Sequence, residues 1–570
     1  MAYQDNLQQE IQYIMKKILF LSVLFTFHFS LLTSLAQNVR MHWQESGRQD
    51  TTITVWRGER ISLEGRAIVD SIPSEGLRIC GRAKKNIATE VGLLGGVITD
   101  DAKGCGNHPM DWPTYKVYDL INTDSVWMPE DSTDIEAARI FCSIDVPRDI
   151  KPGRQYVEVR LVGQDTGSPY SYMGVYLNIL DRTLPRPHDY KFRTNFWQQP
   201  YSVSRWYGLD QWSQDHLDKL RPYMHRLARS GQKCVTAILF YEPWGDQSYD
   251  KFSPMIETTL KADSTWSYDY RVFDKWVNMM ADCGIDQQID CYSMVPWDMT
   301  FRYWDQAKND YSYLKATTSD SSYVTLWTNF LTSFAAHLRQ KGWFQKTRIA
   351  MDERQMPDML RAQAIVQKAV PGMKMVLAGN YHPELTSFLA DYSIAFAQRF
   401  PTDTIAARRS RGQYNSVYTC CTEACPNIFS NSLPLEATYI PLFALANDFD
   451  GYLHWSWMNW ADDPEHESRF RLFSPGDTYV IYPDNHSSVR WERYIEGVEM
   501  AEKVRILREE QQEILNTEDS LLKVGQKEAA RLRLDEINQA LHAFSDGQAD
   551  DNKANHKKVE ILRSVLNRKD

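Results

Sequence analysis

The sequence lacks the short motifs that identify several large classes of enzyme. It contains no H-E-x-x-H zinc motif, no G-x-S-x-G nucleophile elbow, no Walker loop and no dinucleotide-binding glycine fingerprint. Its paired glycines, Gly95-Gly96 and Gly104-Cys105-Gly106, lie in a strand-rich region and are typical of turns. These absences disfavour zinc peptidases, α/β-hydrolases, P-loop enzymes and dinucleotide-dependent oxidoreductases.

The chain also lacks an excess of positive charge. Its 64 Lys and Arg stand against 74 Asp and Glu, which leaves a formal net charge of -10. This balance disfavours a nucleic acid or an anionic membrane surface as partner. Aromatic residues, in contrast, are abundant, with 18 Trp, 30 Tyr and 23 Phe. Flat apolar rings with polar tips suit the binding of sugars, so a glycan substrate is favoured.

The N-terminus has the form of an export signal. Lys16-Lys17 precedes the apolar run 18–29, and Ser34-Leu35-Ala36 offers a small-x-small cleavage site before Gln37. The run is too short and too interrupted for a membrane span, so we expect no integral span in the mature chain. Met15 stands where such a signal begins, which suggests that residues 1–14 precede the true start. We therefore expect residues 1–36 to be removed and the protein to be periplasmic or secreted.

Nine cysteines, an odd number, require at least one free thiol or one intermolecular bond. Export permits disulfides, and two of Cys80, Cys105 and Cys142 in the N-terminal region could pair, although the sequence does not determine the pairing. Residues 420–425 hold the one local cluster, with three cysteines. No second cluster has zinc spacing, so we expect neither a metal nor a cofactor.

Two patterns divide the mature chain. Residues 38–184 contain many short alternating apolar runs separated by turns, which predicts an N-terminal β-sandwich. From residue 190 to 510, strands alternate with amphipathic helices, which predicts a (β/α)8 TIM-like barrel. Residues 511–570 are polar and helical, a C-terminal helical extension. The eight predicted barrel strands are 192–197, 234–240, 285–292, 348–353, 374–377, 392–397, 416–421 and 451–457. The insertion 296–323 is expected to form a lid or loop over the site.

The strongest candidate for chemistry is the acidic pair Asp352-Glu353. It ends the fourth predicted strand, and active sites of this fold lie at the carboxyl ends of the strands. Ordinary glycosidases carry their two carboxylates on different elements, whereas an adjacent pair suits substrate-assisted cleavage of a 2-acetamido sugar. A solvated strand end, or Asp352 capping the next helix, is the structural alternative.

Aromatic and amide side chains at other strand ends are candidate sugar contacts. Trp455 and Trp457 alternate along the last predicted strand and are expected to share one face. Glu242 is the second choice of carboxylate for a conventional two-carboxylate mechanism. The predicted substrate-binding residues are Trp197, Tyr241, Tyr292, Trp297, Asn380, Gln398, Trp455, Trp457 and Asn459.

The chain resembles glycoside hydrolase family 123, the retaining β-N-acetylgalactosaminidases. The resemblance covers residues 40–510 and rests on Asp352-Glu353, the strand end 451–460 and the segments 462–464, 468–470, 474–479 and 487–494. It implies a β-sandwich, a catalytic barrel and release of terminal β-linked N-acetylgalactosamine (GalNAc) from glycans or glycolipids. It also implies that Asp352 orients the acetamido group and that Glu353 is the acid/base. The helices after residue 519 are not part of the family pattern.

Two alternatives to this reading stay open at this point. One is a conventional β-glycosidase that uses Glu353 with Glu242 or another acid at a strand end. The other is a carbohydrate-binding protein without catalytic activity, which would keep the tryptophans but show no turnover.

Overall fold

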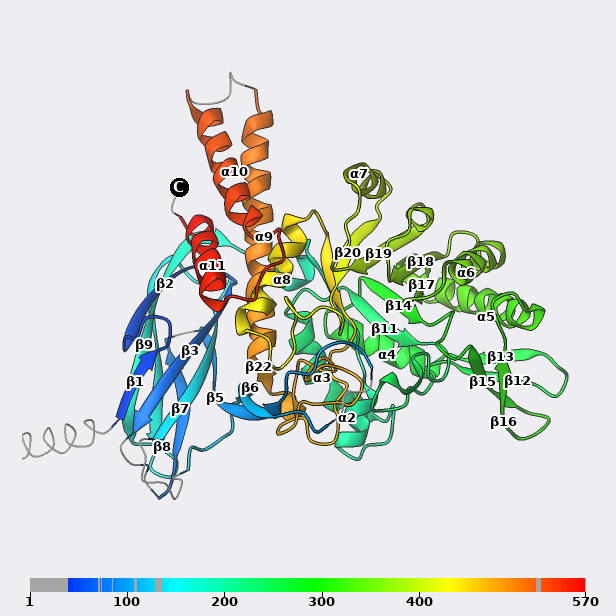
Figure 1. The fold of residues 1–570 in the computed structure, drawn as a ribbon, viewed down its shortest axis with the longest axis horizontal. Helices are drawn as coiled ribbons and strands as arrows, with labels where there is room; N and C mark the ends of the chain where they lie inside the picture. Colours follow the sequence, from blue (N-terminus) through cyan, green and yellow to red (C-terminus); the bar gives the residue numbers. More distant parts are fainter. Residues whose placement is uncertain are drawn as a thin grey trace, which may run out of the picture. The chain divides into compact units, whose positions relative to one another are not determined.

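The computed structural model describes residues 39–69, 72, 74–84, 86–106, 110–128, 136–518 and 524–568. The predicted export signal, residues 1–36, lies outside them. The described chain forms two compact units (Figure 1). The first takes the described residues within 39–57, 61–94 and 121–181, and the second takes those within 58–60, 95–120 and 182–568.

The first unit is built from antiparallel strands with one shared core. Strands β1, β3, β7 and β5 are neighbours in one sheet, and β2, β9, β8 and β4 form another. Alternate residues of β8, such as Val157, Val159 and Leu161, are buried with apolar residues of both sheets. The strands of these two sheets are β1 (Val39–Trp43), β2 (Asp50–Arg57), β3 (Arg60–Val69), β4 (Leu77–Ala83), β5 (Ala88–Thr99), β7 (Glu136–Asp145), β8 (Gly153–Gly163) and β9 (Pro169–Thr183). Strand β6 (Tyr115–Asn122) lies mostly in the second unit.

The second unit contains the predicted barrel. Eight parallel strands lie in the order β10-β21-β20-β19-β18-β17-β14-β11, and a bridge between Thr194 and Gln232 brings the two ends of this sheet together. All eight predicted strands are present, and several are buried along their whole length because helices cover the sheet. The strands are β10 (Arg193–Phe196), β11 (Cys234–Ile238), β14 (Gln288–Tyr292), β17 (Thr347–Met351), β18 (Lys374–Ala378), β19 (Leu389–Ala395), β20 (Tyr414–Tyr418) and β21 (Gly451–His454).

Amphipathic helices connect these strands. In α4 the buried residues Phe273, Trp276, Val277 and Met280 recur at helical spacing, as a helix packed on a sheet requires. Ser213 caps α3 by accepting a hydrogen bond from the His216 N–H. The helices are α2 (Tyr201–Trp206), α3 (Gln214–Ala228), α4 (Arg271–Asp282), α5 (Ser321–Gln340), α6 (Met356–Ala369), α7 (Thr402–Ser410) and α8 (Pro434–Ala446).

A small sheet stands beside the barrel strands. Its order is β13-β12-β15-β16, and it combines insertions that follow β11 and β14. The segment 296–323, expected to be a lid or loop, supplies two of its strands, because the alternating residues on both sides of a turn at Asn309 pair as a hairpin. The strands are β12 (Glu257–Leu260), β13 (Trp266–Asp269), β15 (Thr300–Asp305) and β16 (Asp310–Lys315).

Three helices end the described chain. Strand β22 (Ser487–Ser488) leads into α9 (Val489–Asn516), which runs without a break through residue 510, the predicted domain boundary. Helices α10 (Gln526–His542) and α11 (Asn552–Leu566) pack on α9, and α11 also contacts α8. Within the described residues, we find no helix with the length and apolar character that crossing a membrane requires.

Candidate active site

The acidic pair Asp352-Glu353 follows β17 directly. That strand is fully buried between β14 and β18, so its end opens at the edge where the carboxyl ends of the parallel strands meet. The neighbouring strand β18 ends beside the pair, since a Cβ built on Gly379 would lie 3.6 Å from the Glu353 Cα. The structure therefore confirms that the pair follows the end of a barrel strand.

Asp352 is buried and held by two cationic or polar neighbours. Its side chain is among the buried polar groups at 6% exposure, and the Trp297 indole N–H donates to Oδ2 over 3.2 Å. The Arg354 guanidinium lies 2.9 Å from Oδ1. Burial raises the pKa of Asp352, and the charge of Arg354 opposes that rise.

Arg354 is in turn fixed in place. Its Nε donates to the Val295 carbonyl over 2.6 Å, and its guanidinium stacks over the Trp297 ring at 4.1 Å. Trp297 thus touches both members of the ion pair, although its ring remains 47% exposed. Asp352 has a fixed orientation as a result.

Glu353 has a different setting from its neighbour. Its side chain is exposed, and its Oε1 accepts a hydrogen bond from the hydroxyl of Tyr418, the last residue of β20. Burial raises the pKa of Tyr418 well above its usual value, and the charge of Glu353 raises it further, so this hydroxyl keeps its proton as a donor. We did not single out Tyr418 from the sequence, although an aromatic residue with a polar tip at a strand end is the signal that identified the other candidates.

Three rings gather where β10, β11 and β14 end. Trp197 and Trp244 stack with centroids 5.3 Å apart, and Tyr292 lies 4.5 Å from Trp197. All three are largely buried. The Trp197 indole N–H is buried and has no hydrogen-bond partner within the described part of the chain. The predicted residues Trp197 and Tyr292 therefore lie together, with Trp244 as a third member.

The loop after β11 holds Tyr241 and Glu242. The Arg302 guanidinium, from β15, stacks over the Tyr241 ring at 4.0 Å. The Glu242 carboxylate accepts a hydrogen bond from the Phe252 N–H, and burial raises its pKa to about 7. The Glu242 carboxylate is thus bound by a backbone N–H of the segment that follows it in the chain.

Asn380 and Gln398 follow β18 and β19, and the structure brings their side chains together. The Gln398 Nε2 donates to the Asn380 Oδ1 over 3.1 Å, and the Gln398 Oε1 accepts from the Tyr381 N–H. Asn380 directly follows Gly379, which lies beside Glu353. This amide pair is therefore near Glu353 at the carboxyl ends of the barrel strands.

The expectation that Trp455 and Trp457 share a face is wrong. Strand β21 ends at His454, so the alternation of an extended strand does not continue through these residues. Trp455 is partly exposed, and its indole N–H donates to the Asp477 carboxylate over 3.1 Å. Trp457 is wholly buried against Phe196 and the α9 residue Trp491, so its ring belongs to the core and not to a sugar pocket.

Asn459 is also buried. Its Oδ1 accepts a hydrogen bond from the Tyr249 N–H over 3.1 Å. The Nδ2 group is buried and has no partner among the residues that the structure describes. The side chain thus holds the segment around Tyr249 against the end of the last barrel strand.

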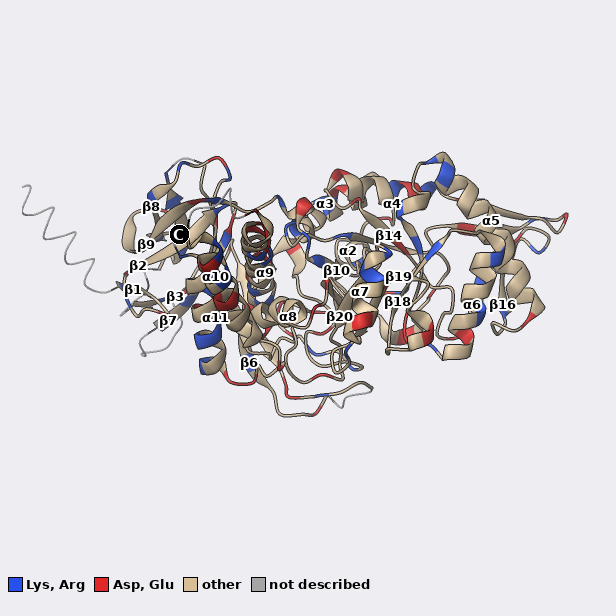
Figure 2. Ribbon diagram, turned by 90° about the horizontal axis from the view of Figure 1, so that it is seen from above, with Lys and Arg blue, Asp and Glu red and all other residues tan. Residues whose placement is uncertain are grey.

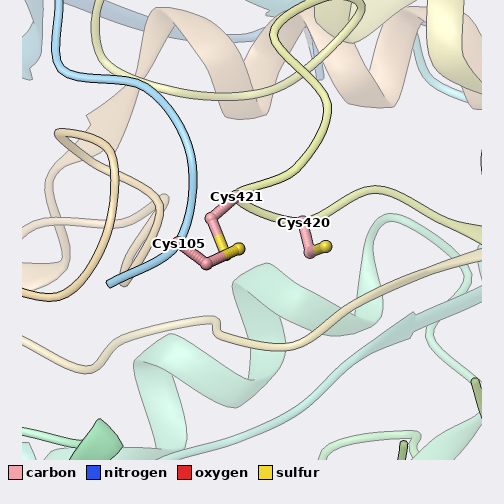
Figure 3. Close-up of side chains that lie close together, drawn as sticks. All are labelled: Cys105, Cys420 and Cys421. Atoms are coloured by element: carbon pink, nitrogen blue, oxygen red, sulfur yellow. A yellow bond between two sulfur atoms is a disulfide. The ribbon is translucent and has the colours of Figure 1, made fainter.

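A disulfide joins Cys105 to Cys421, so Cys105 pairs outside the N-terminal region (Figure 3). The bond spans 316 positions in the sequence and closes three residues beyond Tyr418. The Cys420 thiol lies beside it, and the three sulfur atoms are within 4.8 Å of one another. Two of them are joined in the disulfide, so the group does not offer three thiolates to a metal.

Comparison with known proteins agrees with this architecture. The family model for the glycoside hydrolase 123 catalytic domain matches residues 197–507, more than half of the 570-residue chain. A family 123 glycoside hydrolase from Clostridium perfringens, solved to detail glycolipid glycan hydrolysis, has the same fold with a TM-score of 0.78. It is 22% identical, and the match covers 93% of this chain and 97% of that one.

Other similarities are weaker. A calcium-binding mutant of Bacteroides uniformis β-glucuronidase 2 and a B. uniformis β-glucuronidase each reach a TM-score of 0.28, at 10% and 8% identity. Both matches cover 79% of this chain, and 48% and 49% of the two enzymes, and they support no inference. No curated protein matches the sequence significantly. On the strength of the matched catalytic domain, the chain belongs to glycoside hydrolase family 123.

Proposed function

We propose that the protein is an exo-acting β-N-acetylhexosaminidase that releases terminal β-linked GalNAc, with retention, by substrate-assisted catalysis. The observation that carries the proposal is the pair of adjacent carboxylates with unlike surroundings at the end of β17. Asp352 is buried and clamped, whereas Glu353 is exposed and bonded to one hydroxyl. Two carboxylates in unlike surroundings can take two roles in one reaction.

Asp352 is suited to hold the acetamido group of the sugar. In its ionised form it would accept the acetamido N–H and stabilise the positive charge that develops as the acetamido oxygen attacks the anomeric carbon. Trp297 and Arg354 keep the carboxylate at one angle, and Arg354 favours the ionised form. Orientation of this kind lowers the barrier because the attacking group is already positioned.

Glu353 is suited to be the general acid and then the general base. Its exposed carboxyl group would protonate the leaving oxygen and afterwards take a proton from the water that opens the oxazoline. The hydroxyl of Tyr418 fixes one of its oxygens and leaves the other for the substrate. The acetamido oxygen would attack the anomeric carbon from the face opposite the leaving group. Water would then attack from the face opposite the acetamido oxygen, so that two inversions give net retention.

The choice of sugar and of its carrier rests on family membership. The likeness to family 123 favours GalNAc, and the Clostridium perfringens enzyme of the same fold acts on glycolipid glycans. We extend a glycan or glycolipid substrate to this chain on that basis. The basic and apolar N-terminal segment supports export, to the periplasm or beyond.

Inhibition by GalNAc-thiazoline, a stable mimic of the oxazoline intermediate, tests the mechanism. We expect competitive inhibition of aryl β-GalNAc hydrolysis, with an inhibition constant well below the KM. An active enzyme that millimolar thiazoline leaves uninhibited would point to the conventional mechanism instead, with Glu242 as the first carboxylate to examine, because burial has raised its pKa to about 7. A chain that binds the sugar without turnover would be a carbohydrate-binding protein.

A further inference from the structure

A cavity lies away from the acidic pair, between strand β13 and helix α5. Its volume is about 780 Å³. Its wall on one side is the strand and the turn before it, from Ser264 to Tyr268, and on the other side the middle of α5, from Asn329 to Ala336. None of its lining residues is among the predicted substrate contacts. We refer to this cavity, with its lining residues 264–268, 329, 332, 333 and 336, as the neutral groove.

The lining of the neutral groove is uncharged and combines apolar surface with many hydrogen-bonding groups. Among the described residues that form it, none is Asp, Glu, Lys, Arg or His. Hydroxyl and amide groups can both donate and accept hydrogen bonds, as the hydroxyls of a sugar do. The groove carries seven such side chains, Ser264, Thr265, Ser267, Tyr268, Asn329, Thr332 and Ser333.

Helix α5 is unusual in the same respect. Its first sixteen residues, 321–336, contain no charged side chain, although 24% of the chain is charged (Figure 2). Thr328, Asn329, Thr332 and Ala336 are nevertheless exposed. A helix with one buried face normally carries charged residues on the other, because water favours them there. The exposed face of this helix is therefore uncharged over most of its length.

Two aromatic rings complete the groove and are held by their neighbours. Trp266 packs edge-on to Tyr303 at 5.1 Å, and Tyr268 packs edge-on to Phe330 at 5.3 Å. The Tyr268 hydroxyl is buried and has no hydrogen-bond partner within the described residues. Rings that are already fixed offer a large contact area at a small loss of conformational entropy. An unpaired buried hydroxyl is a group that a ligand or a water would satisfy.

We propose that the neutral groove is a second carbohydrate-binding site, which takes an uncharged oligosaccharide. The C–H face of one sugar would lie on Trp266, and the hydroxyls of the same or the next sugar would bond to Asn329 and to the capacity left on two engaged hydroxyls. Thr332 Oγ1 donates to the Thr328 carbonyl and can still accept, and Ser333 Oγ accepts from the Tyr270 hydroxyl and can still donate. The absence of cations disfavours sulfated or acidic glycans. The site would keep a glycan chain or a glycan-bearing surface near the enzyme while the barrel edge does the chemistry. It is independent of the identity of the sugar that the barrel cleaves.

Titration calorimetry tests the groove with defined oligosaccharides. The probes are cellotetraose and chitotetraose, which lack the terminal β-GalNAc that the barrel is proposed to cleave, with a chondroitin tetrasaccharide as the anionic comparison. The proteins are the unmodified chain, Thr332→Lys, Trp266→Ala and Thr325→Lys. Thr325 is exposed on the same helix but does not line the groove, so its variant is the matched control for Thr332→Lys.

We expect at least one neutral probe to bind the unmodified chain and Thr325→Lys alike, and to bind Thr332→Lys and Trp266→Ala about tenfold more weakly or not at all. Hydrolysis of small aryl glycosides should be the same in the unmodified chain and Thr332→Lys. Equal binding to all four proteins, no binding of any neutral probe, or a preference for the anionic probe would overturn the proposal. A concentration-dependent dimer that Thr332→Lys abolishes would assign the groove to protein association and overturn it as well.

Discussion

The edge of the barrel at β17 and the neutral groove at β13 and α5 both combine aromatic rings with polar groups, yet they differ in charge. At the barrel edge Asp352, Glu353 and Arg354 are adjacent in sequence, and hydrogen bonds from Trp297 and Tyr418 fix the two carboxylates. The neutral groove has no charged lining residue. Charged side chains that stabilise a transition state must be held in a fixed orientation. Binding a neutral sugar requires only aromatic rings and hydrogen-bonding groups. The comparison therefore predicts that changes at one region leave the other intact.

The largest effect is expected from Glu353→Gln. Loss of the acid/base should lower kcat on substrates with poor leaving groups by about 10²–10⁴-fold, because general acid–base catalysis contributes that much. Activated aryl substrates should lose less in the first step. Steady-state kinetics with two leaving groups measures the difference, and calorimetry should show unchanged oligosaccharide binding in the neutral groove. Full activity on poor leaving groups would remove Glu353 from the acid role.

A smaller effect, on the pH dependence of kcat/KM, is expected from Arg354→Met. The guanidinium favours the ionised form of Asp352 against the effect of burial, so its removal should raise the pKa of that carboxyl group. If Asp352 acts ionised, the acidic limb of the kcat/KM profile should move to higher pH, with a severalfold loss at pH 5 and a smaller one at pH 8. Lys219→Met, at an exposed ion pair of α3, is the control and should leave the profile unchanged. An unmoved limb in Arg354→Met would show that the group titrating there is not Asp352.

The smallest catalytic effect is expected from the double variant Cys105→Ser/Cys421→Ser. The disulfide ties the segment after β20 in place, three residues from Tyr418, so kcat should fall severalfold while binding in the neutral groove stays the same. The melting temperature should fall as well, since a disulfide typically contributes about 2–4 kcal/mol. Scanning calorimetry and kinetics measure both, with Cys420→Ser as control. Unchanged values in the double variant would show that the bond is dispensable.

The sequence predicted the barrel and the position of the acidic pair because both depend on local patterns. Buried parallel strands are short apolar runs, and β17 ends at the carboxylates that follow Met351. All eight barrel strands could be found in this way. Trp297 was predicted as a site residue, but its bond to Asp352 and the bond from Tyr418 to Glu353 have no local signal, because they join residues 55 and 65 positions apart. The pairing of Cys105 with Cys421, across 316 positions, has none either.

The wrong expectations also have a physical cause. Alternation assigned Trp457 to the same face as Trp455, but the strand stops at His454 and the chain turns Trp457 into the core. The sheet of β12, β13, β15 and β16 was missed because its strands are polar and come from two insertions that pair in space. Local patterns do not report pairing of that kind.

The most direct test of the account is hydrolysis of aryl β-GalNAc, aryl β-GlcNAc and aryl β-galactoside, side by side, by the chain from residue 37 onward. We predict rapid release from aryl β-GalNAc, little from aryl β-GlcNAc and none from the galactoside, because the galactoside lacks the acetamido group that we propose Asp352 holds. Release from the galactoside at a comparable rate would contradict substrate assistance.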